Sequence, residues 1–216
     1  MSQMYPFLKS LAENNKREWF EENRDWYERA KTDAEALVES CIFEIGRFED
    51  LGDLKPKQAM FRIHRDVRFS KNKDPFKSSF SAMISRDGKR SMTSFAYYLH
   101  FQPGETFVAA GVYEPTSEQL AKIRQEIDYN ADDLKKIIEA PEFVNRFGTL
   151  LGAQLKTAPK GFPKDHPEID LLRYNQFYFS TPFREEEVLS ASFPKNLAEV
   201  CKQIRPFLEF MNRALD

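Results

Sequence analysis

The residues best suited to chemistry lie in one segment, from Lys55 to Arg90. It holds eleven Lys or Arg and three Asp, a local net charge of +8 in a chain whose formal net charge is −2. Arginine binds phosphate or carboxylate through two parallel hydrogen bonds, and lysine acts as a mobile point charge. Backbone amides and hydroxyl groups of a loop can add further donors. The segment therefore predicts an anion site, against the plainer alternative of a solvated basic surface.

Within this segment, residues Ala59 to Phe69 alternate between apolar and polar, which predicts a β-strand. Arg65 falls on the apolar face, between Ile63 and Val67. A guanidinium there needs a carboxylate, carbonyl groups or a ligand, because an unpaired buried charge is strongly destabilising. The Ser, Lys, Asn, Asp and Pro residues that follow predict a loop.

The predicted ligand-binding residues come from the strand, the loop and a later strand pair. Those of the strand and loop are Arg62, Arg65, Arg68, Ser70, Lys73 and Lys77. Tyr98, His100 and Tyr113 join them if the later strands pair with the basic strand, and their rings could then stack on a ring of the ligand. The anticipated ligand is a small molecule that bears phosphate or carboxylate.

An enzyme acting on a phosphorylated or acyl substrate is an alternative function, because Arg and Lys stabilise negative charge that develops during such transfers. The only evident groups for acid–base work are His64, His100 and Asp66. The sequence contains no glycine-rich phosphate loop, dinucleotide motif, nucleophile elbow or paired-histidine zinc motif. No metal is predicted, the cofactor is unknown, and whether the chain is an enzyme stays open.

A nucleic-acid binder and a partner-docking module are further alternatives. The first would combine the positive charge with the Phe side chains interleaved in the segment, although a sequence pI near 6.0 disfavours a duplex-DNA binder. The second would pair the basic segment with the acidic remainder of a second copy. The oligomeric state is not predicted.

The run RIHRDVRFSKNKDPFK, Arg62 to Lys77, resembles the central motif of a bacterial conserved-hypothetical family, domain of unknown function 2461. The resemblance covers nearly the whole chain, since further stretches match at Asn14 to Arg24, Tyr97 to Pro115, Leu120 to Ile127 and Leu155 to Arg173. It implies that certain residues belong to the family pattern, namely Arg62, Arg65, Asp66, Arg68, Ser70, Lys73, Pro75 and Lys77. It implies no activity, because the function of the family is not established.

Composition predicts one α+β domain spanning residues 1–216. Of the 216 residues 41% are hydrophobic, with 20 Phe and 8 Tyr, which is enough for a sizeable core. Cys41 and Cys201 lie in separate apolar helical patterns, typical of buried, reduced thiols in a cytoplasmic protein. We expect no signal peptide and no membrane span.

Strands grouped in the middle of the chain, with helices before and after, predict an antiparallel sheet of about four to six strands packed by long N- and C-terminal helices. Besides 59–69, strands are predicted over 79–85, 94–102, 106–114 and 174–181. Helices are predicted over 4–13, 16–48, 117–127, 130–139, 141–151 and from 192 onward. Gly111, inside a strand, predicts a bulge, or else the close approach of another backbone or a ligand.

Overall fold

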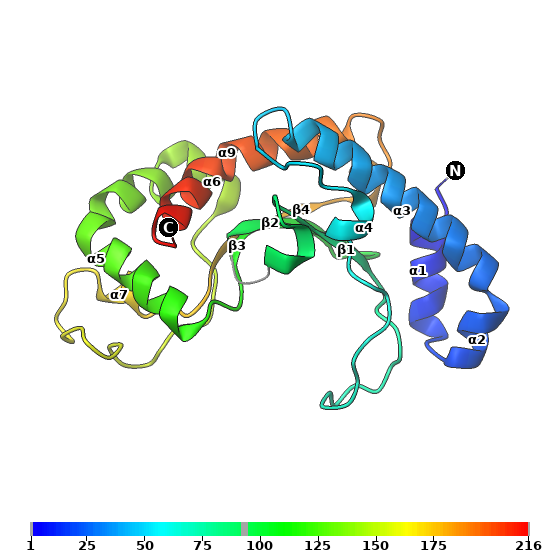
Figure 1. Ribbon diagram of the computed structural model, residues 1–216, viewed down its shortest axis with the longest axis horizontal. Helices are drawn as coiled ribbons and strands as arrows, with labels where there is room; N and C mark the ends of the chain where they lie inside the picture. The colour runs from blue at the N-terminus through cyan, green and yellow to red at the C-terminus, as the bar shows by residue number, and fades with distance from the viewer. Residues whose placement is uncertain (1, 92–94, 216) are drawn as a thin grey trace. The chain divides into compact units, whose positions relative to one another are not determined.

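The chain folds into an α+β structure around a four-stranded antiparallel sheet with the order β1-β2-β3-β4, seen in a computed structural model that describes residues 2–91 and 95–215 (Figure 1). The strands are β1 (Phe80–Ile84), β2 (Ala96–Phe101), β3 (Thr106–Val112) and β4 (Phe177–Phe183). These strands confirm four of the predicted ones, although Ser94, the first residue predicted in the second of them, lies outside the described residues.

The helices precede, interrupt and follow the sheet. They are α1 (Met4–Glu13), α2 (Arg17–Glu22), α3 (Arg24–Ile45), α4 (Pro56–Ala59), the 3-10 helix η1 (Gly88–Ser91), α5 (Ser117–Ile138), α6 (Pro141–Phe147), α7 (Ile169–Leu172), α8 (Glu185–Val188) and α9 (Phe193–Arg213). The part of the chain described here contains no helix long and apolar enough to cross a membrane. Cys41 and Cys201 are buried thiols, as predicted.

Two predicted helices differ from the structure at an asparagine. The helix predicted over 16–48 is wrong, because α2 and α3 are separated at Asn23, whose φ of −109° and ψ of 20° are not helical. The Asn23 side-chain amide donates to the carbonyl of Trp19 at 2.9 Å, a local bond of the kind that competes with helical continuation. At Asn130, the predicted break is a kink within α5, with φ −130° and ψ 30°.

The chain divides into two compact units. Unit 1 comprises Met1–Lys89, Tyr98–Val108 and Pro182–Ala198, and unit 2 comprises Arg90–Tyr97, Ala109–Thr181 and Glu199–Asp216. Residues of β2, β3 and β4 belong partly to each unit. The prediction of a single domain over 1–216 therefore stays a prediction.

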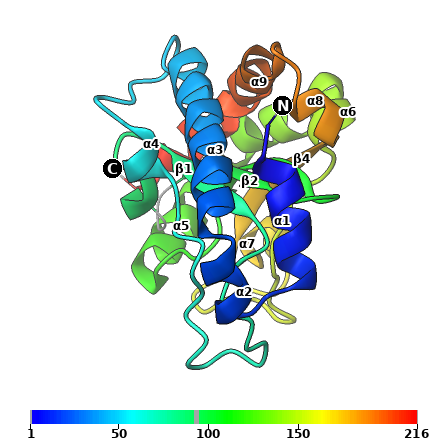
Figure 2. The same ribbon diagram turned by 90° about the vertical axis from the view of Figure 1, so that its right-hand side faces the viewer.

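In unit 1, α1 packs against α3, with α2 beside their common end (Figure 2). Phe7 is fully buried at this contact, and its ring centroid lies 5.7 Å from Trp26 and 6.1 Å from Trp19. Apolar residues at helical spacing on both helices create this face, and aromatic pairs with such centroid separations add to the burial of area.

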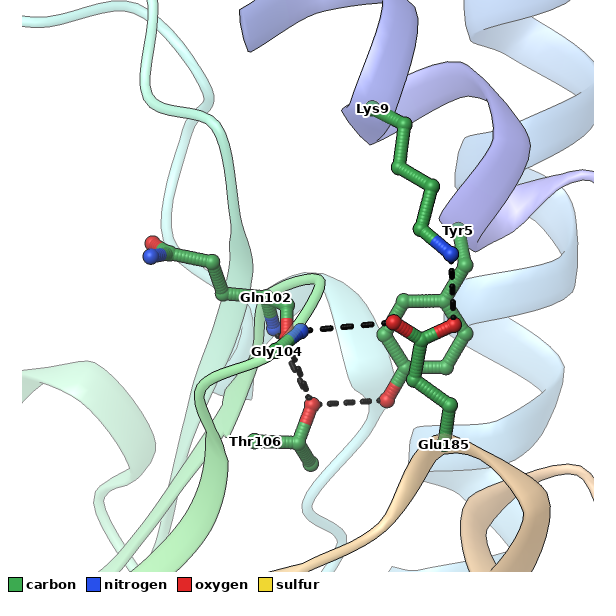
Figure 3. Close-up of polar contacts among 6 residues, drawn as sticks. All are labelled: Tyr5, Lys9, Gln102, Gly104, Thr106 and Glu185. Carbon is green, nitrogen blue, oxygen red and sulfur yellow. Dashed lines mark hydrogen bonds and ion pairs between the residues drawn. The ribbon is translucent and has the colours of Figure 1, made fainter.

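A hydrogen-bond cluster connects α1 to the turn between β2 and β3 (Figure 3). Thr106 Oγ1 donates to the carbonyl of Gln102 at 2.9 Å and accepts from the Gln102 amide at 3.2 Å. Because that hydroxyl proton is already used, the Tyr5 hydroxyl donates to Thr106 Oγ1, at 2.7 Å. Tyr5 is buried, and burial raises its pKa to about 12.

Glu185, at the start of α8, completes this cluster (Figure 3). One of its carboxylate oxygens accepts from the amide of Gly104 at 3.3 Å, and the other pairs with the ammonium of Lys9 at 2.9 Å. Helix α1, the β2–β3 turn and α8 are thus held together by polar contacts that come from three distant parts of the sequence.

We predict that Tyr5→Phe lowers the free energy of unfolding at pH 7 by about 1 kcal/mol, the usual net value of one hydrogen bond. The pKa of Tyr5 is raised in the folded state, so its stabilising contribution is complete below pH 10 and is lost as pH rises from about 10 toward about 12. Over that pH range, the free energy of unfolding of the wild type should fall by about 1.4 kcal/mol more per pH unit than that of the variant. Urea unfolding at pH 7, 10 and 11 measures both effects. Parallel pH profiles of stability for the wild type and Tyr5→Phe would contradict the raised pKa of Tyr5.

Unit 2 has its own aromatic core. Phe179 of β4 packs edge to face on Phe143 at 4.9 Å and on Phe207 at 5.0 Å. The half-buried Arg124 of α5 donates to the carbonyls of Leu172 and Tyr174, and burial lowers its pKa. This arginine holds the segment between α7 and β4 against α5.

Gly111 marks the close approach of another backbone, one of the outcomes its position predicted. A Cβ atom there would lie 2.0 Å from the carbonyl oxygen of Phe177 and 2.5 Å from the Cα of Tyr178. Its φ of +147° is also one that residues with a side chain rarely adopt.

We expect Gly111→Ala to destabilise the protein by at least about 2 kcal/mol more than Gly148→Ala, because only the first forces a clash with a neighbouring strand. Gly148 is a matched control in the same unit, since it too has a positive φ, +70°, but a Cβ atom added there would meet nothing within 4 Å. Thermal and urea unfolding of the two variants test this difference. Equal losses would show that β4 can move away from β3 at little cost.

Candidate anion-binding site

Residues 60–82 of the basic segment form an irregular hairpin in unit 1, so the strand predicted over residues 59–69 is wrong. Isolated antiparallel bridges join Met60 to Ala82 and His64 to Phe76. The bridges are four positions apart on the first leg and six on the second, so the two legs cannot keep the register of a regular ladder. Figures 1 and 2 both show the connecting residues as a long loop that projects from α4 and β1.

Phe76 anchors the base of this hairpin. The side-chain amide of Asn15 donates to the carbonyl of Phe76 at 3.0 Å and accepts from its backbone amide at 3.1 Å, as a neighbouring strand would. The ring of Phe76 stacks on Phe20 with centroids 4.0 Å apart, and the His64 ring packs against it in a T-shaped arrangement at 5.2 Å. His64 thus has a packing role at the base of the hairpin.

Cations at the tip of the hairpin make their contacts within the tip. Arg68 donates to Asp66 through Nε at 3.0 Å and Nη2 at 2.7 Å, and these bonds lower the pKa of Asp66. The ammonium of Lys73 donates to the carbonyl of Val67 at 2.9 Å. Phe69, next to Arg68, is 95% exposed. The charge of Arg68 is therefore balanced locally by a carboxylate.

Cations at the base have a different environment. Lys77 is half-buried, and burial lowers its pKa, which the guanidinium groups of Arg62 and Arg65 lower further. Arg65 is half-buried, and its Nη2 donates to Ser70 Oγ at 3.4 Å. Within residues 2–91 and 95–215, no carboxylate forms a salt bridge with any of these three cations. The structure thus places Lys77 near Arg62 and Arg65, with Ser70 bonded to Arg65. Arg62 is exposed and also helps to lower the pKa of Asp66.

A row of rings continues from Lys77 across the sheet. The Lys77 ammonium lies 5.5 Å from the ring centroid of Phe61, and Phe61 lies 6.1 Å from Tyr98 on β2. Tyr98 lies 6.1 Å from Phe107 on β3, which stacks on His100 at 4.8 Å. All are half-buried, because they alternate with fully buried residues that face the core.

Hydrogen bonds order the polar atoms of this row. Gln102 Oε1 can only accept, so His100 Nε2 carries the proton in the bond between them at 3.3 Å, and Tyr98 donates to His100 Nδ1 at 3.3 Å. The Gln102 amide in turn donates to Glu105 at 2.9 Å. Burial lowers the pKa of His100, and Lys77 lowers it further, against the opposite effects of Gln102 and Glu105. His100 is therefore neutral at pH 7.

The remaining predicted residue, Tyr113, belongs to unit 2, where its ring lies 5.7 Å from Tyr178 and is 60% exposed. Phe61 and Phe107 were not among the predicted ligand-binding residues. Alternation along residues 106–114 could have indicated Phe107, because it stands on the opposite face from Val108. Among the described residues, no three His, Cys, Asp or Glu side chains are grouped so as to hold a metal ion.

We predict that Arg65→Gln raises the pKa of Lys77, because it removes one of the two like charges that lower it. Arg68→Gln is the matched control, since Arg68 is paired with Asp66 and does not contribute to the shift. NMR titration of the lysine Cε and Nζ signals, with Lys77 assigned by substitution, measures this. An unchanged Lys77 titration in Arg65→Gln would show that the two cations do not interact.

The comparisons with known proteins concern almost the whole chain. The model of a conserved hypothetical protein family, domain of unknown function 2461, matches residues 3–210. No significant match was found among curated proteins or solved structures. The match includes both the hairpin and the row of rings.

Proposed function

We propose that this chain, which belongs to the conserved hypothetical protein family of domain of unknown function 2461, binds the anionic group of a small molecule at Arg62, Arg65 and Lys77. One observation carries the proposal. The half-buried Lys77 ammonium lies near two guanidinium groups, and within the described residues it has no hydrogen bond or salt bridge. A phosphate or carboxylate would supply the missing acceptor and counter-charge.

The electrostatics of the site predict in which direction the pKa of Lys77 should change when an anion binds. Like charges close together disfavour one another, and partial burial removes the water that would otherwise screen them. A bound anion brings an opposite charge that offsets the repulsion, so binding should raise the pKa of Lys77. By linkage, affinity should fall as pH rises through the pKa of free Lys77, because the neutral amine attracts an anion less.

The test is calorimetric titration with phosphate, pyrophosphate and sugar phosphates at low ionic strength. We expect Lys77→Met and Arg65→Gln each to weaken binding by about 10-fold or more, the usual effect of losing a charge-assisted hydrogen bond. Arg68→Gln, which removes a cation from the same hairpin, should change affinity by less than about 3-fold because that charge is paired with Asp66. No binding by the wild type, or equal losses in all three variants, would refute a site at the base.

Other functions have less support from the geometry. An enzyme acting on a phosphorylated or acyl substrate would need a free proton acceptor, but Asp66 is paired with Arg68 and His100 Nδ1 accepts from Tyr98. The third candidate, His64, packs its ring against Phe76 and Phe20 at the base of the hairpin.

A nucleic-acid binder would use several exposed rings, yet of the Phe side chains in the basic segment Phe76 and Phe80 are buried and Phe61 is half-buried, which leaves Phe69 at the tip as the exposed one. Steeply salt-dependent binding to single-stranded probes would favour the nucleic-acid function. The proposal supposes a cytoplasmic protein, which the two buried, reduced thiols support.

A further inference from the structure

We infer that the anionic group bound at the base of the hairpin is attached to a planar ring, which lies on the half-buried rings of Phe61 and Tyr98. The inference rests on the proposed anion site and names the class of ligand that it takes. Ligands of this class include nucleoside phosphates and aromatic carboxylates, which share a flat ring joined to an anion.

The first step is that the cation and the rings are immediate neighbours. The Lys77 ammonium lies 5.5 Å from the Phe61 centroid, and the Phe61 and Tyr98 rings are 6.1 Å apart at an angle of 58°. A ligand whose anion reaches Lys77 would therefore place the attached atoms against these two rings. Arg62 and Arg65 border the same ammonium group closely enough to lower its pKa.

The second step is that these rings lie on the solvent-facing side of the sheet. Phe61 comes from the hairpin beside β1, because its amide donates to the carbonyl of Ser81 at 2.9 Å. Tyr98 belongs to β2, between the buried residues Tyr97 and Leu99. An antiparallel sheet with one solvated face usually carries polar side chains there. Here that side instead carries half-buried rings beside a half-buried cation, which offers apolar surface and positive charge to the same ligand.

The third step concerns the kind of recognition that these rings allow. The Tyr98 hydroxyl is bonded to His100, and the other nitrogen of His100 is bonded to Gln102. Because these polar atoms are engaged by each other, we expect a ligand to contact the rings through their faces. Stacking on ring faces depends little on the identity of the ring, so we expect tolerance among planar groups.

The experiment compares pyrophosphate, ribose 5-phosphate, ADP, UDP, adenosine and 4-hydroxybenzoate by calorimetric titration. ADP should bind at least about 10-fold more tightly than pyrophosphate, and UDP should resemble ADP. Phe61→Leu, which keeps apolar volume but removes the aromatic ring, should abolish this advantage, so that ADP and pyrophosphate bind the variant with similar affinity. Phe69→Leu is the control, because Phe69 is 95% exposed at the tip. Far-UV circular dichroism establishes that each variant is folded.

The outcomes separate this inference from the proposed function. Equal affinity for ADP and pyrophosphate, in the wild type and in Phe61→Leu, overturns the ring inference and leaves the anion site standing. Loss of pyrophosphate binding in Lys77→Met supports the anion site, whereas no binding of any anion refutes both. Adenosine binding as tightly as ADP would show that the rings act without the cations, which overturns the inference as stated. Binding of 4-hydroxybenzoate but not of nucleotides supports it and identifies an aromatic carboxylate as the ligand.

Discussion

The pairing of the Asn15 side chain with the backbone of Phe76 is the constraint on which the candidate site depends. The two residues are 61 positions apart, and the amide group makes two hydrogen bonds of 3.0 and 3.1 Å to one peptide position. The hairpin itself is irregular, so it has few ladder bonds of its own. With Phe76 fixed and stacked on Phe20, the neighbouring Lys77 amide bonds to the carbonyl of Ile63 at 2.8 Å. The two legs are thereby held together at their base.

This anchoring separates two electrostatic environments within one short segment. At the tip, Arg68 has a carboxylate partner two residues away and behaves as an ordinary exposed ion pair. At the base, Lys77 is half-buried beside two guanidinium groups, with no salt bridge among the described residues. Folding that gathers like charges in this way is unfavourable in isolation, and such arrangements are concentrated at functional sites. The charge that matters is therefore a small part of the +8 carried by the segment.

The sheet adds a row of aromatic side chains next to the base of the hairpin. Strand alternation sends Tyr98 and His100 of β2 to the same side as Phe107 of β3, while the intervening residues fill the core. A chain of hydrogen bonds from Tyr98 through His100 to Gln102 keeps these side chains in one arrangement. Membership of a family without an established reaction leaves function to be argued from such a site rather than from the fold.

Local pattern in the sequence was sufficient for most of the regular elements. Alternation and turn residues located the four strands, and helical spacing located α1 at residues 4–13 and the final helix. The same logic failed for residues 59–69, where alternation suggested a strand. The partner leg carries two more residues between the bridges, and no local pattern reveals such a mismatch.

The sequence by itself determined the α+β class, the strands of the sheet and the concentration of positive charge before β1. Tertiary structure alone decided that Lys77 is half-buried beside Phe61, whose ring contacts Tyr98, and near the guanidinium groups of Arg62 and Arg65. The physical reason is the distance along the chain over which each kind of information extends. Periodicity reports how each residue sits on its own element, but charge pairing and ring contacts depend on where segments far apart in the chain are brought together.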